Sequence, residues 1–458
     1  MPRCCLIARP TADQPRHVSD TSDLAGGGDE RATGFRTNVV TALPVATAGM
    51  LANGANVIVT ILLARILTTQ GYGAYAQLTG LFLIVSMPGS AIIVAVVRRT
   101  ALWRTTGSHQ ALARWATRMH ERMVWLLVAY ALVVAAICIP VADLLAKPSP
   151  LAVAAMMLGA GVWVVLCVDR GFLQGTRSYR PLAANLLIEG GVRTVTVLAF
   201  AAIGKLPGAA IGILVAELLT AVHARRAAGR ALHHATDDGL AVAPPSIRRD
   251  LVVDLIAALV ALALIAVLQN IDVILFGQLN PQLSGAYAAV SVMCKGLVFV
   301  AIVLGGYLLP EAAISYHEGT HALRQLSATM AMLAVPAVLL VAASIAIPEQ
   351  LIKLIFGARY LGAQDAFEPL AIAMVLFSIT VLLSFYLLAH GERWIVFVLA
   401  VGAGAAALAV EMAHGAPAAT AQNDLWVQIA LVAVTSVGFA LSHQRAHGRP
   451  SPLASLDG

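Results

Sequence analysis

The chain has 458 residues, of which 59% are hydrophobic and only 12% are charged, and its formal net charge is +6. A soluble domain has about 25% charged residues, so this composition, with a mean hydropathy of +0.82, excludes an ordinary soluble protein. Apolar runs of about 20 residues recur along the chain, each long enough to cross a bilayer as a helix. The sequence therefore predicts an all-α polytopic membrane protein.

Twelve spans are expected between two tails. Residues 1–37 are rich in Asp, Thr, Gly and Arg, which is the composition of a disordered tail, and residues 443–458 are similar. The spans of the first half lie at about 39–62, 75–97, 123–145, 151–173, 181–203 and 206–222. The spans of the second half lie at about 251–277, 284–309, 325–348, 366–389, 394–412 and 425–442.

A basic connection at 225–250, which contains Pro244 and Pro245, divides the spans six and six. The expected domains are an N-terminal six-helix bundle at 38–224 and a C-terminal six-helix bundle at 251–442. The connection between them is predicted to be a cytoplasmic linker.

The arginines indicate the orientation. Sixteen lie in the connections that follow even-numbered spans, against five arginines and lysines in those that follow odd-numbered spans. By the positive-inside rule both termini are then cytoplasmic. This topology explains the net charge, and so little chain lies outside the membrane that no nucleic-acid partner is expected.

The two halves share a short repeat. The letters GAYA occur at 73–76 and again at 285–288, an offset of 212 residues, and each copy lies between the first and second span of its half. Two halves with the same topology predict a pair of pseudo-symmetric six-helix bundles. Transporters often place their substrate site between such halves.

Several stretches resemble the polysaccharide (Wzx-like) flippases of the multidrug/oligosaccharidyl-lipid/polysaccharide exporter superfamily. They are LLARILTTQGYGAYAQLTG, DRGFLQGTRSYRPLAANLLIEGGVRT, QNIDVILFGQL, YLLPEAAISYHEGTHALRQL and IFGARYLGAQDAFEPLAIAM. Their order and spacing, from about residue 38 to 440, carry the resemblance. It implies a V-shaped pair of six-helix bundles that exports a lipid-linked glycan across the bacterial cytoplasmic membrane.

Two charges interrupt an apolar run of the fifth span, LLIEGGVRTVTVL at 186–198. Glu189 and Arg193 are four residues apart and so share a helix face, and Arg193 lies about 18 Å from the cytoplasmic end. Charges at this depth are costly and usually face a cavity or a partner. Either the two form a self-neutralising pair, or they line a cavity in which Arg193 meets an anion.

The second half places Lys295 at a similar depth, about 16 Å from the outer end of the eighth span. Lys295 has no acidic neighbour on its own helix, and Asp272 lies on the seventh span, closer to the outer face. Either Asp272 pairs with Lys295 across the two spans, or Lys295 meets an anionic substrate. Glu217, near the cytoplasmic end of the sixth span, is expected to snorkel or to cap a helix.

These residues predict a mechanism. A glycan on polyprenyl pyrophosphate has an anionic head, which Arg193 and Lys295 would neutralise in a cleft between the bundles while the tail stays in membrane lipid. A polar stripe on the first span would either line this cleft or hold helices together; it comprises Asn53, Asn56 and Thr60. Asp272 or Glu189 would bind a coupling proton or sodium ion. Glycan polymerase and glycosyltransferases are the protein partners that such a function implies.

Three rival functions are weighed. HEGTH, residues 317–321, matches the zinc-protease pattern H-E-x-x-H, but Gly319 weakens a helix there and a third protein ligand is missing. A membrane glycosyltransferase would need a larger outer connection with catalytic acids. A drug exporter of the same superfamily is the nearest rival and would favour an acid-lined pocket. No cofactor is expected, and the five cysteines show no metal-binding spacing.

Overall fold

A computed structural model describes residues 26–105, 109–145, 148–233, 249–318 and 322–447, and the regular structure in these ranges is helical. The N-lobe comprises α1 (Gly26–Ile66), α2 (Thr69–Ser86), α3 (Pro88–Thr105), α4 (His109–Leu144), α5 (Pro150–Gly175) and α6 (Tyr179–His233). The C-lobe comprises α7 (Arg249–Leu279), α8 (Ser284–Glu318), α9 (Ala322–Ala346), α10 (Pro348–Ile355), η1 (Ala358–Ala366), α11 (Phe367–Ala389), α12 (Trp394–Met412) and α13 (Pro417–His447).

The long α6 is a helical hairpin. Its backbone leaves the helical region at Lys205, where φ is +51°, and Pro207 follows. The two arms then run side by side, because a Cβ on Gly208 would lie 2.0 Å from the Phe200 carbonyl oxygen. The hydroxyl of Thr196 donates a hydrogen bond of 2.8 Å to Gly212 O across the arms. The predicted fifth and sixth spans are therefore these two arms.

A proline also explains why a single membrane span consists of two helices, α2 and α3. Pro88 lacks a backbone N–H and therefore interrupts the helical hydrogen bonds, so α2 ends at Ser86 and α3 begins at Pro88. Together they form an apolar stretch over Thr69–Trp103.

Eleven stretches of the described residues are long and apolar enough to cross a membrane, and one of them, 54 residues long, is the α6 hairpin. With its arms counted separately there are twelve, which confirms the predicted all-α membrane protein.

Some predicted boundaries move. α1 begins at Gly26, inside the segment predicted as a tail, and α6 continues to His233, inside the predicted linker. α13 begins at Pro417, eight residues before the predicted twelfth span. Residues 1–25, 234–248 and 448–458, on which the tail and linker predictions also fall, lie outside the described ranges.

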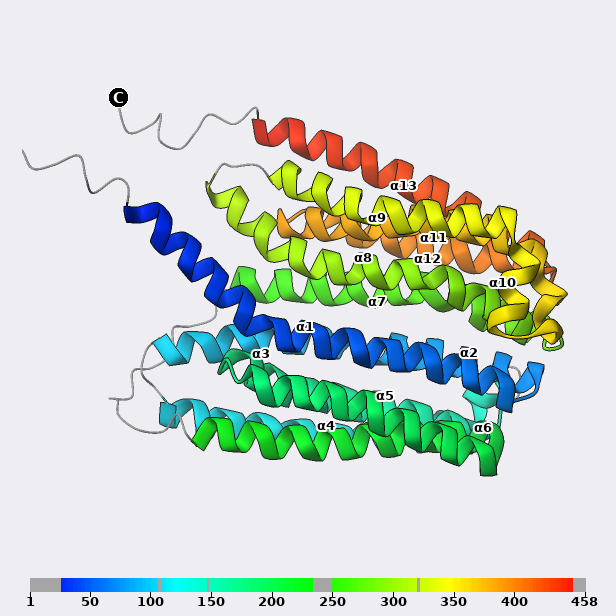
Figure 1. Cartoon of the computed structure of the whole chain (residues 1–458), viewed down its shortest axis with the longest axis horizontal. Helices are drawn as coiled ribbons and strands as arrows, with labels where there is room; N and C mark the ends of the chain where they lie inside the picture. The colour runs from blue at the N-terminus through cyan, green and yellow to red at the C-terminus, as the bar shows by residue number, and fades with distance from the viewer. Residues whose placement is uncertain (1–25, 106–108, 146–147, 234–248, 319–321, 448–458) are drawn as a thin grey trace, which may run out of the picture.

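The two lobes lie side by side, and the helices of each run along the same long axis (Figure 1). α2 packs against α5 within its own lobe and against α7 and α8 of the other lobe. The two GAYA copies meet there: a Cβ on Gly73 would lie 2.7 Å from Gly285 N, and one on Gly285 would lie 1.9 Å from Thr69 O. The repeat is thus a contact between the lobes, as expected if a pseudo-two-fold axis passes through it.

Further contacts join the lobes at the same end of the molecule, where α10 lies on the right of Figure 1. The Ala64 carbonyl oxygen, at the end of α1, accepts hydrogen bonds from Arg359 and from Tyr360, the latter at 2.6 Å. Tyr72 at the start of α2 packs against Phe356 and Tyr360, with ring centroids 6.0 and 5.5 Å apart. The predicted orientation places this end at the outer face of the membrane, and we therefore call these contacts, with those of Gly73 and Gly285, the outer seal.

Cysteine labelling tests the orientation that places this seal outside. We expect a cysteine at position 354 to react with an impermeant maleimide added to whole cells, and one at position 226 to react only after permeabilisation. Both positions hold exposed side chains, Leu354 and Arg226. The native cysteines are replaced beforehand by serine. Labelling of position 226 in intact cells would invert the topology.

Candidate functional site: a charge cluster in each lobe

The N-lobe cluster forms between the arms of α6. Arg193 and Glu217 each lie twelve residues from Lys205, one on either arm, so the hairpin places them at the same depth. The guanidinium of Arg193 donates hydrogen bonds to Glu217 and, at 2.8 Å, to Glu189 one turn away on its own arm. Its other terminal nitrogen lies 3.3 Å from Asn56 Oδ1 on α1. Arg193 thus links both arms of α6 to α1.

A second arginine completes the cluster from α5. Arg170 donates a hydrogen bond of 2.5 Å to Oε2 of Glu189, the oxygen that does not bind Arg193, and one of 2.8 Å to Asn185 Oδ1. Asn185 in turn donates to Thr220 O at 3.0 Å. Two arginines and two glutamates cancel in formal charge, and the side chain of Glu217 is fully buried. The cluster can therefore stay inside the lobe without a net charge, although each ion alone would be costly there.

α1 approaches this cluster closely because Gly190 has no side chain. A Cβ on Gly190 would lie 2.9 Å from Ala52 Cα. Of the predicted polar stripe, Asn56 reaches Arg193, the hydroxyl of Thr60 donates to Asn56 O at 2.8 Å, and Asn53 is exposed. Asn56 thus joins α1 to α6, and the role of the stripe in lining a cleft stays a prediction.

The C-lobe cluster joins α7, α8 and α13. Lys295 Nζ donates a hydrogen bond of 2.8 Å to Asp272 Oδ1. The other oxygen of Asp272 accepts from Tyr287 at 3.3 Å and from Ser291 at 3.2 Å. Asp424 on α13 lies within electrostatic range of both Asp272 and Lys295. Lys295 forms its ion pair with Asp272, and with Asp424 nearby the three groups have a formal charge of −1 when both aspartates are ionised.

Asp424 keeps one oxygen unsatisfied. Its Oδ1 accepts a bond of 3.2 Å from Gln428, whereas its Oδ2 is buried and has no hydrogen-bond partner in the described part of the chain. A buried carboxylate oxygen without a partner is costly. A bound proton or a small cation would satisfy it.

The tyrosine of each GAYA copy faces the cluster of its own lobe. Tyr287 contacts Asp272 directly, and Tyr75, its counterpart 212 residues earlier, lies within electrostatic range of Arg193. The contact between the lobes and the two clusters are thus parts of one region.

The structure brings the predicted charged residues together within each lobe, and Arg193 and Lys295 belong to different clusters. Glu189 pairs with Arg193 and Asp272 with Lys295, and contact of either cation with an anionic substrate stays a prediction. The interpretation of Glu217 as a residue that snorkels or caps a helix is wrong, because its buried carboxylate binds Arg193. Arg170 is one of the sixteen arginines that the sequence analysis counted in connections after even-numbered spans, and it lies inside α5 instead.

Three members of the clusters were missed, and two of them left a signal in the sequence. GKLPG at 204–208 marks a tight turn, and counting twelve residues to either side of Lys205 would have paired Glu217 with Arg193. Asp424 would have been found by starting the last span at the proline of GAP, residues 415–417. Arg170 had no such signal, since its side-chain direction depends on how α5 packs against α6.

The HEGTH stretch is only partly described. Residues 319–321 lie outside the described ranges, and His317 and Glu318 end α8. Within those ranges no group of three or more His, Cys, Asp or Glu side chains is placed to hold a metal ion.

Comparisons with known proteins show likeness at the level of structure. No family model and no curated protein sequence matches the chain. An inward-facing multidrug resistance MATE family transporter of the MOP superfamily has a TM-score of 0.65 at 14% identity, over 88% of this chain and 99% of that one. An outward-facing MATE structure has a TM-score of 0.59 at 14% identity, over 89% and 96%. The lipid II flippase MurJ, in an inward closed conformation, has a TM-score of 0.61 at 10% identity, over 87% of both chains. At such low identities, these likenesses show that the chain has the fold of these proteins.

Proposed function

We propose that the chain is an ion-coupled membrane transporter that moves an anionic, lipid-linked glycan precursor across the membrane by alternating access. The observation that carries this proposal is a buried charge cluster in each of two lobes that are joined at the outer seal. Charged groups inside a membrane protein usually mark a substrate or ion pathway. Two lobes that can rock about a shared contact provide alternating access.

The seal supports an inward-facing state for the conformation described here. Its contacts, which include those of Ala64, Tyr72 and Tyr360, close the predicted outer end. The higher TM-score for the inward-facing MATE structure than for the outward-facing one agrees with this assignment. In the proposed cycle the seal opens after the substrate head has bound from the cytoplasmic side.

Arg193 is the residue of the N-lobe cluster that we propose contacts the substrate head. Its side chain remains 16% exposed, whereas that of Glu217 is fully buried. Arginine binds phosphate through a planar fork of two hydrogen bonds. In the proposed mechanism the pyrophosphate takes the place of Glu217 or Glu189 on the guanidinium, and Lys295 contacts the head from the C-lobe. The carrier would be polyprenyl pyrophosphate in a bacterial cytoplasmic membrane, with glycosyltransferases and a glycan polymerase acting before and after transport.

The C-lobe cluster is our proposed ion-coupling site. Asp272 pairs with Lys295, Asp424 lies within electrostatic range of both, and one oxygen of Asp424 has no partner among the described residues. A proton or sodium ion on Asp424 would remove the formal excess charge. The same two acids also support the second candidate, export of an organic cation, since buried carboxylates favour a positive ligand.

Transport in proteoliposomes tests the proposal. We expect the purified chain to move a fluorescent polyprenyl-pyrophosphate-linked oligosaccharide between leaflets, measured by protection from a membrane-impermeant quencher. Arg193→Lys should lower the rate roughly tenfold, because lysine keeps the charge beside Glu217 but loses the two-pronged contact with phosphate.

The matched control is Lys353→Arg, which alters a cation at the predicted outer surface whose side chain is 47% exposed and pairs with Glu349. It should transport at the wild-type rate. Transport of an organic cation, with none of the lipid-linked glycan, would contradict the glycan proposal and support the second candidate.

A further inference from the structure

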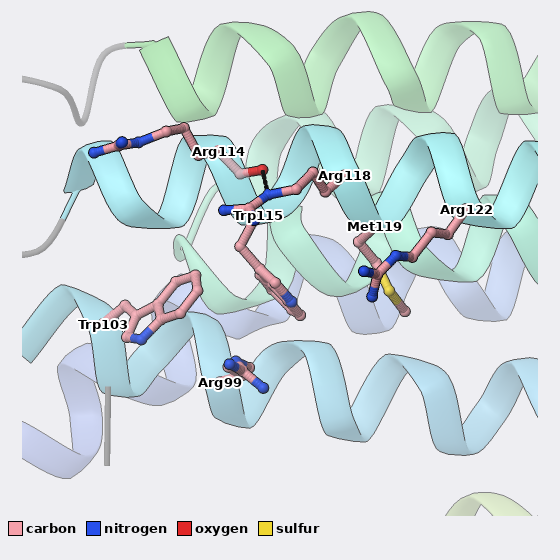
Figure 2. A pocket seen from close by; sticks show the side chains of 7 residues that line it. All are labelled: Arg99, Trp103, Arg114, Trp115, Arg118, Met119 and Arg122. Carbon is pink, nitrogen blue, oxygen red and sulfur yellow. Dashed lines mark hydrogen bonds between the residues drawn. The ribbon is translucent and has the colours of Figure 1, made fainter. Parts of the chain in front are cut away.

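A basic pocket lies between α3 and the first turns of α4 (Figure 2), and no member of either charge cluster lines it. Its volume is about 290 Å³, near the lower limit of small-molecule pockets, about 300 Å³. It is lined by Arg99, Trp103, Arg114, Trp115, Arg118, Met119 and Arg122. Four arginines and two tryptophans thus converge on a space the size of a small polar group.

The aromatic side chains hold part of this pocket in place. The guanidinium of Arg99 lies 5.0 Å from the ring centroid of Trp103 and 5.1 Å from that of Trp115, which is a double cation–π contact. Trp115 also packs edge-on against Trp103 and against the buried Phe172 of α5. Arg99 therefore rests on a rigid platform and is oriented before any ligand arrives.

The arginines of α4 form one row. Arg114, Arg118 and Arg122 are spaced by four residues, so they follow one another on a single helix face. Like charges at this spacing repel each other. Within the described residues, neither Arg118, Arg122 nor Arg99 forms a salt bridge with a carboxylate. An anion bound between α3 and α4 would relieve this repulsion.

Topology alone does not account for the row. The positions 212 residues later, at the corresponding place in the C-lobe, hold Leu326, Met330 and Ala334. Both halves have the same predicted orientation, yet only the N-lobe carries three arginines on this face. The row is therefore a local feature of α3 and α4.

The surface beyond the row indicates the class of ligand. Leu126 continues the same helix row one turn after Arg122 and is 59% exposed, and Trp125 beside it is 73% exposed. An amphiphile with a phosphate head at the arginines would lay its acyl chains on this apolar surface. Basic pockets between helices at the cytoplasmic side of membrane proteins bind such heads. A soluble phosphate would gain nothing from Leu126 and Trp125.

We propose that the pocket of α3 and α4 binds the phosphate head of an anionic membrane lipid, with two phosphates contacted by the four arginines. Two lipids supply this chemistry, a phospholipid with two phosphates and a polyprenyl diphosphate. The proposal does not depend on the proposed function, because a regulatory lipid would occupy the same pocket in a transporter of any substrate.

Binding of fluorescent cardiolipin, a phospholipid with two phosphates, to the purified full-length chain in detergent micelles tests the proposal by anisotropy. The variant Arg99→Gln/Arg118→Gln/Arg122→Gln should bind it at least about tenfold more weakly. The same three positions changed to lysine should bind with an intermediate affinity, because the charge remains but the planar forks are lost. The lysine variant also keeps the charges that orient the chain in the membrane.

The control variant is Arg180→Gln/Arg226→Gln/Arg230→Gln, which removes the same charge from exposed positions of α6 outside the pocket. It should bind within about twofold of wild type, because charges outside the pocket contact no phosphate. Unlabelled polyprenyl diphosphate competing more strongly than unlabelled cardiolipin would identify the carrier lipid as the occupant, and the reverse would identify a phospholipid. Equal loss in the control variant, or equal competition by phosphatidylcholine or by free pyrophosphate, would overturn the proposal.

Discussion

Arg193→Ala is expected to destabilise the folded chain by about 3–5 kcal/mol, the usual result of removing one partner of a buried ion pair. Arg193 contacts both Glu189 and Glu217. Its loss leaves the carboxylate of Glu217 buried without a cation, while Glu189 retains Arg170. The change is measured as the midpoint of thermal unfolding in detergent, followed by loss of the monodisperse peak in size-exclusion chromatography.

A second substitution should recover most of this loss. In Arg193→Ala/Glu217→Gln no unpaired charge remains between the arms of α6, so its stability should lie within about 1–2 kcal/mol of wild type. Glu189→Gln combined with Arg193→Ala should recover much less, because Glu217 stays ionised and Arg170 loses its carboxylate. A larger recovery through position 189 than through position 217 would contradict the assignment of Glu217 as the partner that depends on Arg193.

The exposed pair of Lys353 and Glu349 supplies the matched control. These residues are also four apart on one helix, but their side chains are 47% and 50% exposed. Such exposed pairs contribute about 0.3–0.5 kcal/mol. Lys353→Ala should therefore leave the unfolding midpoint almost unchanged, which separates the effect of burial from that of losing an ion pair.

The spans could be predicted from sequence because the thickness of the bilayer sets their length. The same reasoning placed Arg193 and Lys295 at mid-membrane depth, since depth follows from counting residues along a helix. The partners of these charges were harder to predict. A span has several faces, and the direction of Arg170 toward Glu189 depends on how α5 packs against α6.

The sequence alone also missed the cluster roles of Glu217 and Asp424, because these depend on contacts between distant helices and on where those helices begin and end. Glu217 was assigned to the end of the sixth span, and Asp424 fell just before the predicted twelfth span at 425–442, because an apolar run gives no sharp signal of where its helix begins. The structure starts α13 at Pro417 and continues α6 to His233, which moves both acids into helix interiors. The short GAYA match, in contrast, correctly indicated two related halves, and its glycines are the residues that touch.

Gly285→Ala is expected to open the outer seal. A Cβ at position 285 would lie 1.9 Å from the Thr69 carbonyl oxygen, a backbone atom that cannot turn aside. Overpacking of this kind costs about 1–3 kcal/mol, and only the conformation with the seal closed bears the cost. The population should therefore shift roughly tenfold toward conformations in which the lobes separate at this end.

Distances between spin labels at positions 70 and 350 measure this shift. Gln70 lies on α2 and Gln350 on α10, and both side chains are exposed. Wild type should show mainly one short distance, and Gly285→Ala should add a longer one as its main population. Gly296→Ala, on the same helix, is the control, because no atom outside its own helix lies within 4 Å of a Cβ there. An unchanged distance distribution in a folded Gly285→Ala protein would show that the contact between the GAYA copies is not the contact that holds the seal closed.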